Sequence, residues 1–229
     1  METKESFGLI WDQTGVLYKY GRGNVSKSFR EVFKRHKIDF HEEIFSEKYR
    51  GTSLANQIKM WKEDLGFDMP LSLKQLSEES AEIQYKNIDK EQERDSALIR
   101  LLDDLKKRKV PMIVATSSTR GRALKILNIL DLSHYFIDVV SCDDVVKHEP
   151  ATDTIYLASQ KMNLPLTHCI VIEDAASGIS AAKKAGCKTI GYAVYSEDQY
   201  KSLVDAGADK VIRDFKEIDY SVLAGLCLK

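Results

Sequence analysis

The chain has 229 residues, of which 43% are hydrophobic and 30% charged, and this balance excludes an intrinsically disordered protein. Its 34 basic and 35 acidic residues leave a net charge of −1, so the overall charge favours neither nucleic acid nor an anionic membrane as a partner. A membrane-spanning helix needs about 18 consecutive apolar residues, and no apolar run in the sequence approaches that length. The chain is about one and a half times as long as a typical domain, which predicts one full domain carrying a smaller one.

The N-terminus and the cysteines favour a cytoplasmic protein. Residues 1–5 carry mixed charge and lead into a short apolar run, which is not the pattern of a signal peptide. None of the four cysteines belongs to a C-x-x-C pair, so we expect buried free thiols in a reducing compartment rather than disulfides or zinc ligands. Nothing in the sequence sets the oligomeric state, and a monomer or weak homo-oligomer is the working expectation.

In chain order, the first predicted element is a buried strand at residues 7–11, followed by a region of helical patterns without a convincing strand, residues 20–91. This region predicts an all-helical domain inserted after the first strand. Its predicted apolar helix faces are Phe29, Val32 and Phe33; Leu54, Ile58, Trp61 and Leu65, with Ser53 as the cap and Gly66 at the end; and Leu73, Leu76 and Ile83.

The remainder of the chain alternates predicted strands with predicted helices. This alternation predicts an α/β fold with a doubly wound parallel sheet covered on both faces, formed by residues 1–19 and 92–229. The predicted strands are residues 111–115, 136–140, 169–172 and 188–192, and the predicted helices are residues 96–105 with Ser96 as N-cap, 119–130 and 175–184.

Polar residues follow three of the predicted strands. Asp12 follows the first, Thr116 and Ser117 follow the second, and Glu173 and Asp174 follow another. Singly, each is most often a turn residue, a helix cap or a partner of a helix dipole. Because ligands of a parallel sheet bind at the carboxyl ends of its strands, together they predict a site. Carboxylates suit Mg²⁺, and hydroxyls beside a helix start suit a phosphate.

Three motifs resemble those of the haloacid dehalogenase (HAD) superfamily, within it the β-phosphoglucomutase-like phosphatases with a helical cap. The resemblance covers essentially the whole chain and implies a HAD-like core with an inserted cap. The motifs are the D-x-D-G-[TV]-L pattern at residues 12–17, the strand ending in Thr116, and the E-D-[SA]-x-x-G-[IV]-x-A-A pattern at residues 173–182.

The resemblance implies a Mg²⁺-dependent phosphohydrolase acting on a small phosphorylated metabolite. Asp12 would attack phosphorus and form an aspartyl-phosphate that water then hydrolyses. Thr116 and Ser117 would contact the phosphoryl oxygens. The implied Mg²⁺ ligands are Asp12, the backbone carbonyl of Thr14 and Asp174, with Glu173 beside them, and the cap loop implied to contact substrate contains Gly51 and Thr52.

The chain departs from the family pattern at Thr14, where the family carries a second aspartate as general acid and base. A threonine hydroxyl does not titrate near neutral pH, so an unaided site loses a contribution of roughly 10²–10⁴-fold. Some relatives, including the P-type ATPases and phosphonoacetaldehyde hydrolase, also lack this aspartate, so the substitution does not exclude phosphoryl transfer.

A second departure lies in the family's G-K-P-x-P-D motif. Aligned on Pro150 and Asp153, the lysine position holds Glu149, and Lys147 lies two residues earlier. If the segment is extended, residues i and i+2 point the same way, and Lys147 supplies the ammonium as a catalytic cation. The alternative is that both are surface charges and the site lacks this cation.

The cap also differs from that of the sugar-phosphate mutases. Leu54 stands where those enzymes place a phosphate-binding arginine, and Asn24 replaces their histidine. A β-phosphoglucomutase-type mutase is therefore disfavoured, and so is a phosphonatase, because Lys48 and Lys59 miss the position of a Schiff-base lysine. Two hypotheses stay open: a phosphohydrolase with weakened acid–base assistance, and a catalytically weak or inactive binding or regulatory protein that keeps the fold.

Overall fold

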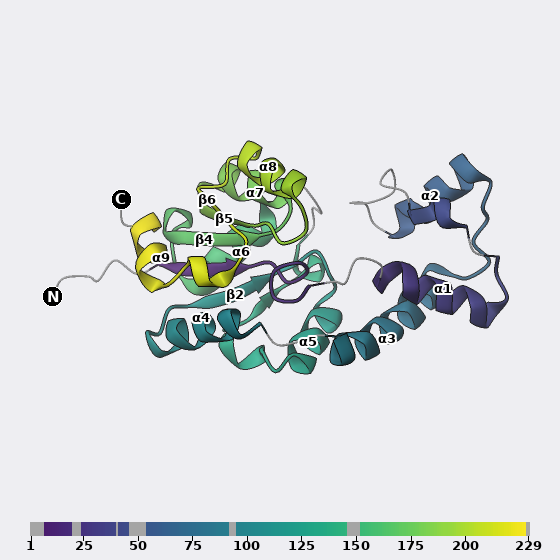
Figure 1. Cartoon of the computed structure of the whole chain (residues 1–229), viewed down its shortest axis with the longest axis horizontal. Helices are drawn as coiled ribbons and strands as arrows, with labels where there is room; N and C mark the ends of the chain where they lie inside the picture. The colour runs from purple at the N-terminus through teal and green to yellow at the C-terminus, as the bar shows by residue number, and fades with distance from the viewer. Residues whose placement is uncertain are drawn as a thin grey trace. The chain divides into compact units, whose positions relative to one another are not determined.

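A computed structural model of the chain describes residues 7–19, 24–39, 41–45, 54–91, 95–145 and 152–227. The chain divides into two compact units (Figure 1). One consists of Met1–Lys19 together with Gln92–Lys229, and the other is Tyr20–Glu91.

The larger unit contains a six-stranded parallel sheet in the order β3-β2-β1-β4-β5-β6. In Figure 1 the purple arrow of β1 lies between β2 and β4. The chain order reverses at β1 and β4, which makes their carboxyl ends the switch point at which such sheets bind ligands. The strands are β1 (Gly8–Trp11), β2 (Met112–Ala115), β3 (Val139–Val140), β4 (Cys169–Glu173), β5 (Lys188–Tyr192) and β6 (Lys210–Ile212).

Both faces of the sheet are buried under helices, which confirms the predicted doubly wound α/β fold. Because successive strand residues point to opposite faces, Leu9 and Trp11 pack in a cluster with α4, α5 and α9, and Ile10 packs in another with α6 and α7. The helices of this unit are α4 (Ser96–Lys107), α5 (Arg120–Ile129), α6 (Asp153–Met162), α7 (Ala176–Ala185), α8 (Glu197–Asp205) and α9 (Tyr220–Cys227).

Several predicted boundaries need correction. The strand predicted over residues 136–140 is only β3, and Ile137 is 55% exposed, so the apolar run does not mean continuous burial. The N-cap of α4 is Asp95 rather than Ser96, because the Asp95 carboxylate accepts the N–H groups of Ala97 and Leu98. Helices α6, α8 and α9 and strand β6 were not predicted from periodicity.

The regular elements described in the smaller unit are all helical. Its elements are α1 (Asn24–His36), a 3₁₀ turn (Glu42–Phe45), α2 (Leu54–Leu65) and α3 (Leu73–Glu91). It has its own core, in which the predicted faces of α1 and α2 meet around the fully buried Trp61. Leu65 and Leu73, predicted to be apolar-face residues, are instead 40% and 45% exposed, because they lie at helix ends.

The four cysteines are free thiols, and Cys169 and Cys187 are buried. Burial raises the pKa of each of these two thiols to about 12, so both are neutral near pH 7. Among the described residues, no helix combines the length and the apolar character needed to cross a membrane.

Candidate functional site

The carboxyl ends of β1, β2 and β4 bring the predicted polar residues to one edge of the sheet. The hydrogen-bonded ladder extends one residue past β1 and β2: the Asp12 N–H donates to the Ile172 carbonyl (2.9 Å), and the Thr116 N–H donates to the Val140 carbonyl (2.9 Å). These bonds place Asp12 and Thr116 at the carboxyl ends of the strands, where Asp12 is half-buried and Thr116 is buried. Glu173 is the last residue of β4, and Asp174 follows it.

Asp12, Glu173 and Asp174 form an acidic cluster. One carboxylate oxygen from each lies within 4.8 Å of the others, and all three residues are half-buried. Burial raises the pKa of Asp174 to about 6, because the charged form loses hydration. A divalent cation would offset this loss, and hard oxygen donors are the ligands that Mg²⁺ takes, so the cluster fits a Mg²⁺ site.

Glu173 is held in this cluster by the backbone that follows it. Its Oε1 accepts the N–H groups of Asp174 (3.1 Å) and Ala175 (3.0 Å). The third residue of α7, Gly178, leaves space for this carboxylate, since a Cβ there would lie 2.4 Å from the Glu173 Cδ. The glycine of the 173–182 motif is therefore explained by close approach rather than by backbone conformation.

Gly15 brings the loop after β1 close to the same cluster. Its φ of +95° lies in the left-handed region, and a Cβ would lie 2.1 Å from Asp174 Oδ2. The Gly15 N–H donates to the Tyr18 carbonyl (2.8 Å), and the buried Gln13 side chain donates from Nε2 to the Ala123 carbonyl (2.9 Å). Only glycine satisfies both the φ angle and the space, so this loop has one well-defined path past Asp174.

Thr14, the departure from the family pattern, is paired with a tyrosine. Its Oγ1 lies 3.1 Å from the phenol oxygen of Tyr18, and the two residues also form a parallel backbone bridge. Tyr18 is 2% exposed, whereas Thr14 is half-buried. Sequence reasoning missed Tyr18, because a tyrosine four residues after Thr14 in a turn follows no recognisable motif.

The loop after β2 supplies hydroxyl groups and the start of α5. Thr116 is buried, and its Oγ1 accepts the Ser118 N–H (3.2 Å), whereas Ser117 is exposed. Thr119 is the N-cap of α5 but makes no side-chain capping bond. The hydroxyl groups of this loop and the N–H groups at the start of α5 are donors suited to phosphate oxygens.

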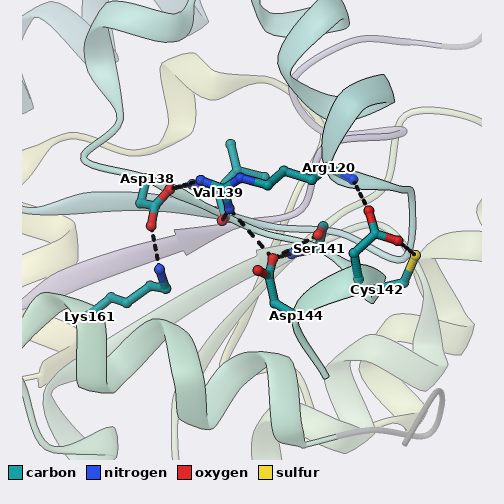
Figure 2. A network of polar contacts seen from close by, with 8 residues as sticks. Arg120, Asp138, Val139, Ser141, Cys142, Asp144 and Lys161 are labelled. Atoms are coloured by element: carbon teal, nitrogen blue, oxygen red, sulfur yellow. Dashed lines mark hydrogen bonds and ion pairs between the residues drawn. The ribbon is translucent and has the colours of Figure 1, made fainter. Parts of the chain in front are cut away.

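A polar network fixes this loop from the side of β3 (Figure 2). The Arg120 backbone N–H donates to the Asp143 carboxylate (2.8 Å), and its guanidinium donates to the Val139 carbonyl and to Asp138 (both 2.6 Å). The Cys142 N–H donates to the Ser118 carbonyl (3.1 Å). These bonds connect the loop at residues 116–119 to the segment after β3.

Among the carboxylates of the network, Asp138 has the pKa that is shifted most strongly. Burial alone would raise its pKa, but hydrogen bonds from Lys161, Arg120 and the Val139 N–H outweigh this effect and lower it to about 2. Asp144 has a lowered pKa as well, because the Ser141 hydroxyl and N–H both donate to it (2.7 and 2.8 Å). Sequence reasoning missed this network, whose members lie far apart in the chain.

Several predicted site residues lie outside the described residues: Lys147 and Glu149 with Pro150, and the cap loop with Gly51 and Thr52.

The sequence matches a family model described as haloacid dehalogenase-like hydrolase over residues 8–186. Among curated proteins, it is 45% identical over 80 residues to the fructose-1-phosphate phosphatase YqaB of Escherichia coli, covering 35% of this chain and 43% of that one. It is 33% identical over 112 residues to a phosphorylated carbohydrates phosphatase of Thermotoga maritima, covering 49% of this chain and 52% of that one. The matches thus span about half the length of these two relatives.

Among solved structures, the fold is similar to that of a β-phosphoglucomutase from Clostridium difficile, with a TM-score of 0.73 and 19% identity. The superposition covers 97% of each chain. At this level of identity the likeness concerns the fold, which is the HAD-like fold with a helical cap that the motifs imply.

Proposed function

This chain belongs to the haloacid dehalogenase-like hydrolase family, and we propose that it is a Mg²⁺-dependent phosphohydrolase of a small phosphorylated sugar. The observation that carries the proposal is the cluster of Asp12, Glu173 and Asp174 beside Thr116 at the switch point of the sheet. The names of the two curated relatives, which act on fructose 1-phosphate and on phosphorylated carbohydrates, support the substrate class.

In this proposal Asp12 is the nucleophile. Its carboxylate attacks phosphorus, the bond to the leaving oxygen breaks, and the aspartyl-phosphate is then hydrolysed by water. Asp12, Asp174 and the backbone carbonyl of Thr14 would hold Mg²⁺, with Glu173 beside them, and the bound ion would neutralise charge on the phosphoryl oxygens.

Thr116, Ser117 and the N-terminus of α5 would bind the phosphoryl oxygens. Preorganised hydroxyl and N–H donors stabilise the charge that spreads over these oxygens in the transition state. Lys147 remains the proposed cation of the site, and Gly51 and Thr52 remain the proposed cap contacts with the sugar. The free cysteines support the inference of a reducing, cytoplasmic location.

The test is phosphate release from a panel of sugar phosphates and other small phosphate esters, with and without Mg²⁺. We expect turnover that requires Mg²⁺ and is lost in Asp12→Asn, which removes the nucleophile. Asp205→Asn, a matched change of an exposed carboxylate at the end of α8, should leave turnover unchanged. Activity that survives in Asp12→Asn would contradict the proposal.

Trapping provides a second measurement on the same residue. Beryllofluoride binds a nucleophilic aspartate as a mimic of its phosphorylated form, so intact-protein mass and fluorine NMR should detect one adduct in the wild type and none in Asp12→Asn. An adduct that persists in the variant would place the nucleophile elsewhere.

Thr14 supports a second candidate function, a catalytically weak or inactive binding protein. If this candidate holds, the wild type releases no phosphate, and Thr14→Asp combined with Glu149→Lys creates turnover by restoring the acid and the cation. Brisk turnover by the wild type excludes it.

A further inference from the structure

The pair formed by Thr14 and Tyr18 is built into the loop after β1 rather than formed by chance on a surface. Tyr18 is held by its backbone on both sides: its carbonyl accepts the Gly15 N–H (2.8 Å), and its N–H donates to the Gln13 carbonyl (3.3 Å). Its side chain is 2% exposed, and its phenol oxygen lies 3.1 Å from Thr14 Oγ1. The backbone and the packing therefore place the phenol group against the threonine.

The chemistry of the pair has a preferred direction. A phenol, with a reference pKa of about 10, is far more acidic than an aliphatic alcohol, so the Tyr18 hydroxyl is the better donor and Thr14 Oγ1 the better acceptor. Once Oγ1 accepts this bond, the proton of Thr14 points away from Tyr18. A hydroxyl that accepts a strong hydrogen bond also becomes a better donor.

We propose that Tyr18 acts through Thr14 in place of the aspartate that this position carries elsewhere in the family. The inference rests on the proposed function. When Asp12 attacks and the bond from phosphorus to the leaving oxygen breaks, the leaving oxygen keeps the electron pair and takes the proton of Thr14. Thr14 takes the phenol proton of Tyr18, which is left as a phenolate.

The second half of the reaction returns the proton. Water attacks the aspartyl-phosphate, the bond from phosphorus to Asp12 breaks, and a proton of the water passes through Thr14 to the phenolate. The sum is one ester and one water converted into one alcohol and one phosphate, with Asp12, Thr14 and Tyr18 unchanged. Tyr18 is thus a positioning residue, because in this proposal only Thr14 contacts the leaving group.

The control residue is Tyr192, another tyrosine of the same unit. It is fully buried, and its hydroxyl has no hydrogen-bond partner among the described residues. Tyr192→Phe removes the same atom from a buried ring as Tyr18→Phe, but at a site without a role in the proposed chemistry.

The experiment measures kcat and KM for the best sugar phosphate of the panel in the wild type, Tyr18→Phe, Thr14→Asp and the double variant. We expect Tyr18→Phe to lower kcat by at least about tenfold with little change in KM, since general acid–base catalysis typically contributes about 10²–10⁴-fold. In the Thr14→Asp background the same change should have no effect, because the new carboxyl group replaces the relay. Tyr192→Phe should leave kcat unchanged.

A leaving group that needs no proton gives the second readout. The phenolate released from p-nitrophenyl phosphate is a good leaving group, so Tyr18→Phe should slow formation of the aspartyl-phosphate much less with this substrate than with the sugar phosphate. Thr14→Val, which keeps the shape and removes the other hydroxyl, should reproduce the pattern. Thermal unfolding of each variant reports its folded fraction, to which the rates are normalised.

An equal loss of kcat on Tyr18→Phe in the wild-type and Thr14→Asp backgrounds would show a structural role and overturn the inference alone. An equal slowing of aspartyl-phosphate formation with both leaving groups would do the same. Unchanged kcat in Tyr18→Phe would overturn it as well. Turnover that appears only after Thr14→Asp would show that the hydroxyl pair does not replace the carboxyl group. An absence of Mg²⁺-dependent turnover and of Asp12 trapping in every variant would overturn the proposed function, and this inference with it.

Discussion

Gly178 and Gly121 lie in the first turns of α7 and α5, and they differ in what a methyl group would touch. At Gly178 a Cβ would lie 2.4 Å from the Glu173 Cδ, whereas at Gly121 no atom lies within 4 Å. Neither residue has a positive φ. The pair therefore separates the effect of close approach to the acidic cluster from the effect of adding a methyl group to a helix.

We expect Gly178→Ala to displace the Glu173 carboxylate from the N–H groups of Asp174 and Ala175. The lost hydrogen bonds should lower the free energy of unfolding by about 1–2 kcal/mol and raise the Mg²⁺ concentration needed for half-maximal activity. Gly121→Ala should instead raise the free energy of unfolding by up to about 1 kcal/mol, because it replaces glycine at an open helix position. Urea denaturation measures the free energy of unfolding, and Mg²⁺ titration measures the Mg²⁺ concentration for half-maximal activity. Equal changes of these quantities in the two variants would contradict the prediction.

At the scale of single residues, some residues of the candidate site could be predicted from the sequence and others only from the structure. Asp12, Thr116, Glu173 and Asp174 could be selected from the sequence, because each lies where an apolar run of a parallel strand ends. Thr14 could be selected from its place in the motif at residues 12–17. Tyr18 could not, since its closeness to Thr14 depends on how the loop folds back after Gly15.

Among the elements, β3, α5 and α6 are joined through Asp138. Its carboxylate accepts bonds from Arg120 on α5 and Lys161 on α6, and its position precedes β3 (Figure 2). No single periodic pattern in the sequence links Arg120, Asp138 and Lys161 to one another. The contact is decided by the order of the strands, which puts β3 at the edge of the sheet with both α5 and α6 packed beside it.

This network predicts a pH dependence of stability. The folded pKa of Asp138 is about 2, below its ordinary value of 3.8, so the carboxylate stabilises the fold above about pH 4, and this contribution is lost as the pH falls through about 2. A shift of this size corresponds to about 2 kcal/mol. Asp138→Asn should therefore lower the free energy of unfolding by about 2 kcal/mol at pH 7, with the difference from the wild type shrinking as the pH falls from about 4 to 2.

Chemical denaturation at a series of pH values measures this difference. Asp205→Asn, at an exposed carboxylate, should match the wild type throughout. A constant difference between Asp138→Asn and the wild type across the range would show that lost hydrogen bonding, and not charge, accounts for the destabilisation.

For the whole molecule, the two units have separate cores. The clusters around the sheet contain only residues of the larger unit, and the cluster around Trp61 contains only residues of the smaller one. The two points at which the chain leaves and re-enters the larger unit are close, since Lys19 Nζ lies 3.8 Å from Asp95 Oδ2. Among the described residues, the side chains that pack against β1 in these clusters all belong to the larger unit.

We expect a variant in which residues 20–91 are replaced by a short glycine and serine linker to fold. Closing this gap with a short loop carries a small entropic cost, and both sheet faces keep their helices. Circular dichroism and a single cooperative thermal transition would show folding. An unfolded product would mean that the larger unit depends on the smaller one for stability.

The sequence by itself determined the fold class and the family, because alternating buried strands and amphipathic helices leave periodic patterns and the motifs occupy consecutive residues. It also predicted helices within residues 20–91, and the described elements of that range are helices. The sequence did not predict some short or partly exposed elements, because their burial comes from neighbours distant in the chain. Among them are β6, α8 and the true extent of β3.

Only the tertiary structure decided which groups meet. The strand order β2-β1-β4 brings the carboxylates of Asp12, Glu173 and Asp174 within 4.8 Å, and the turn at Gly15 places Tyr18 against Thr14. The physical reason is that periodicity records which face of an element is buried, whereas distances between side chains depend on packing between elements. The substitution at Thr14 is visible in the sequence, but its partner is visible only in the folded chain.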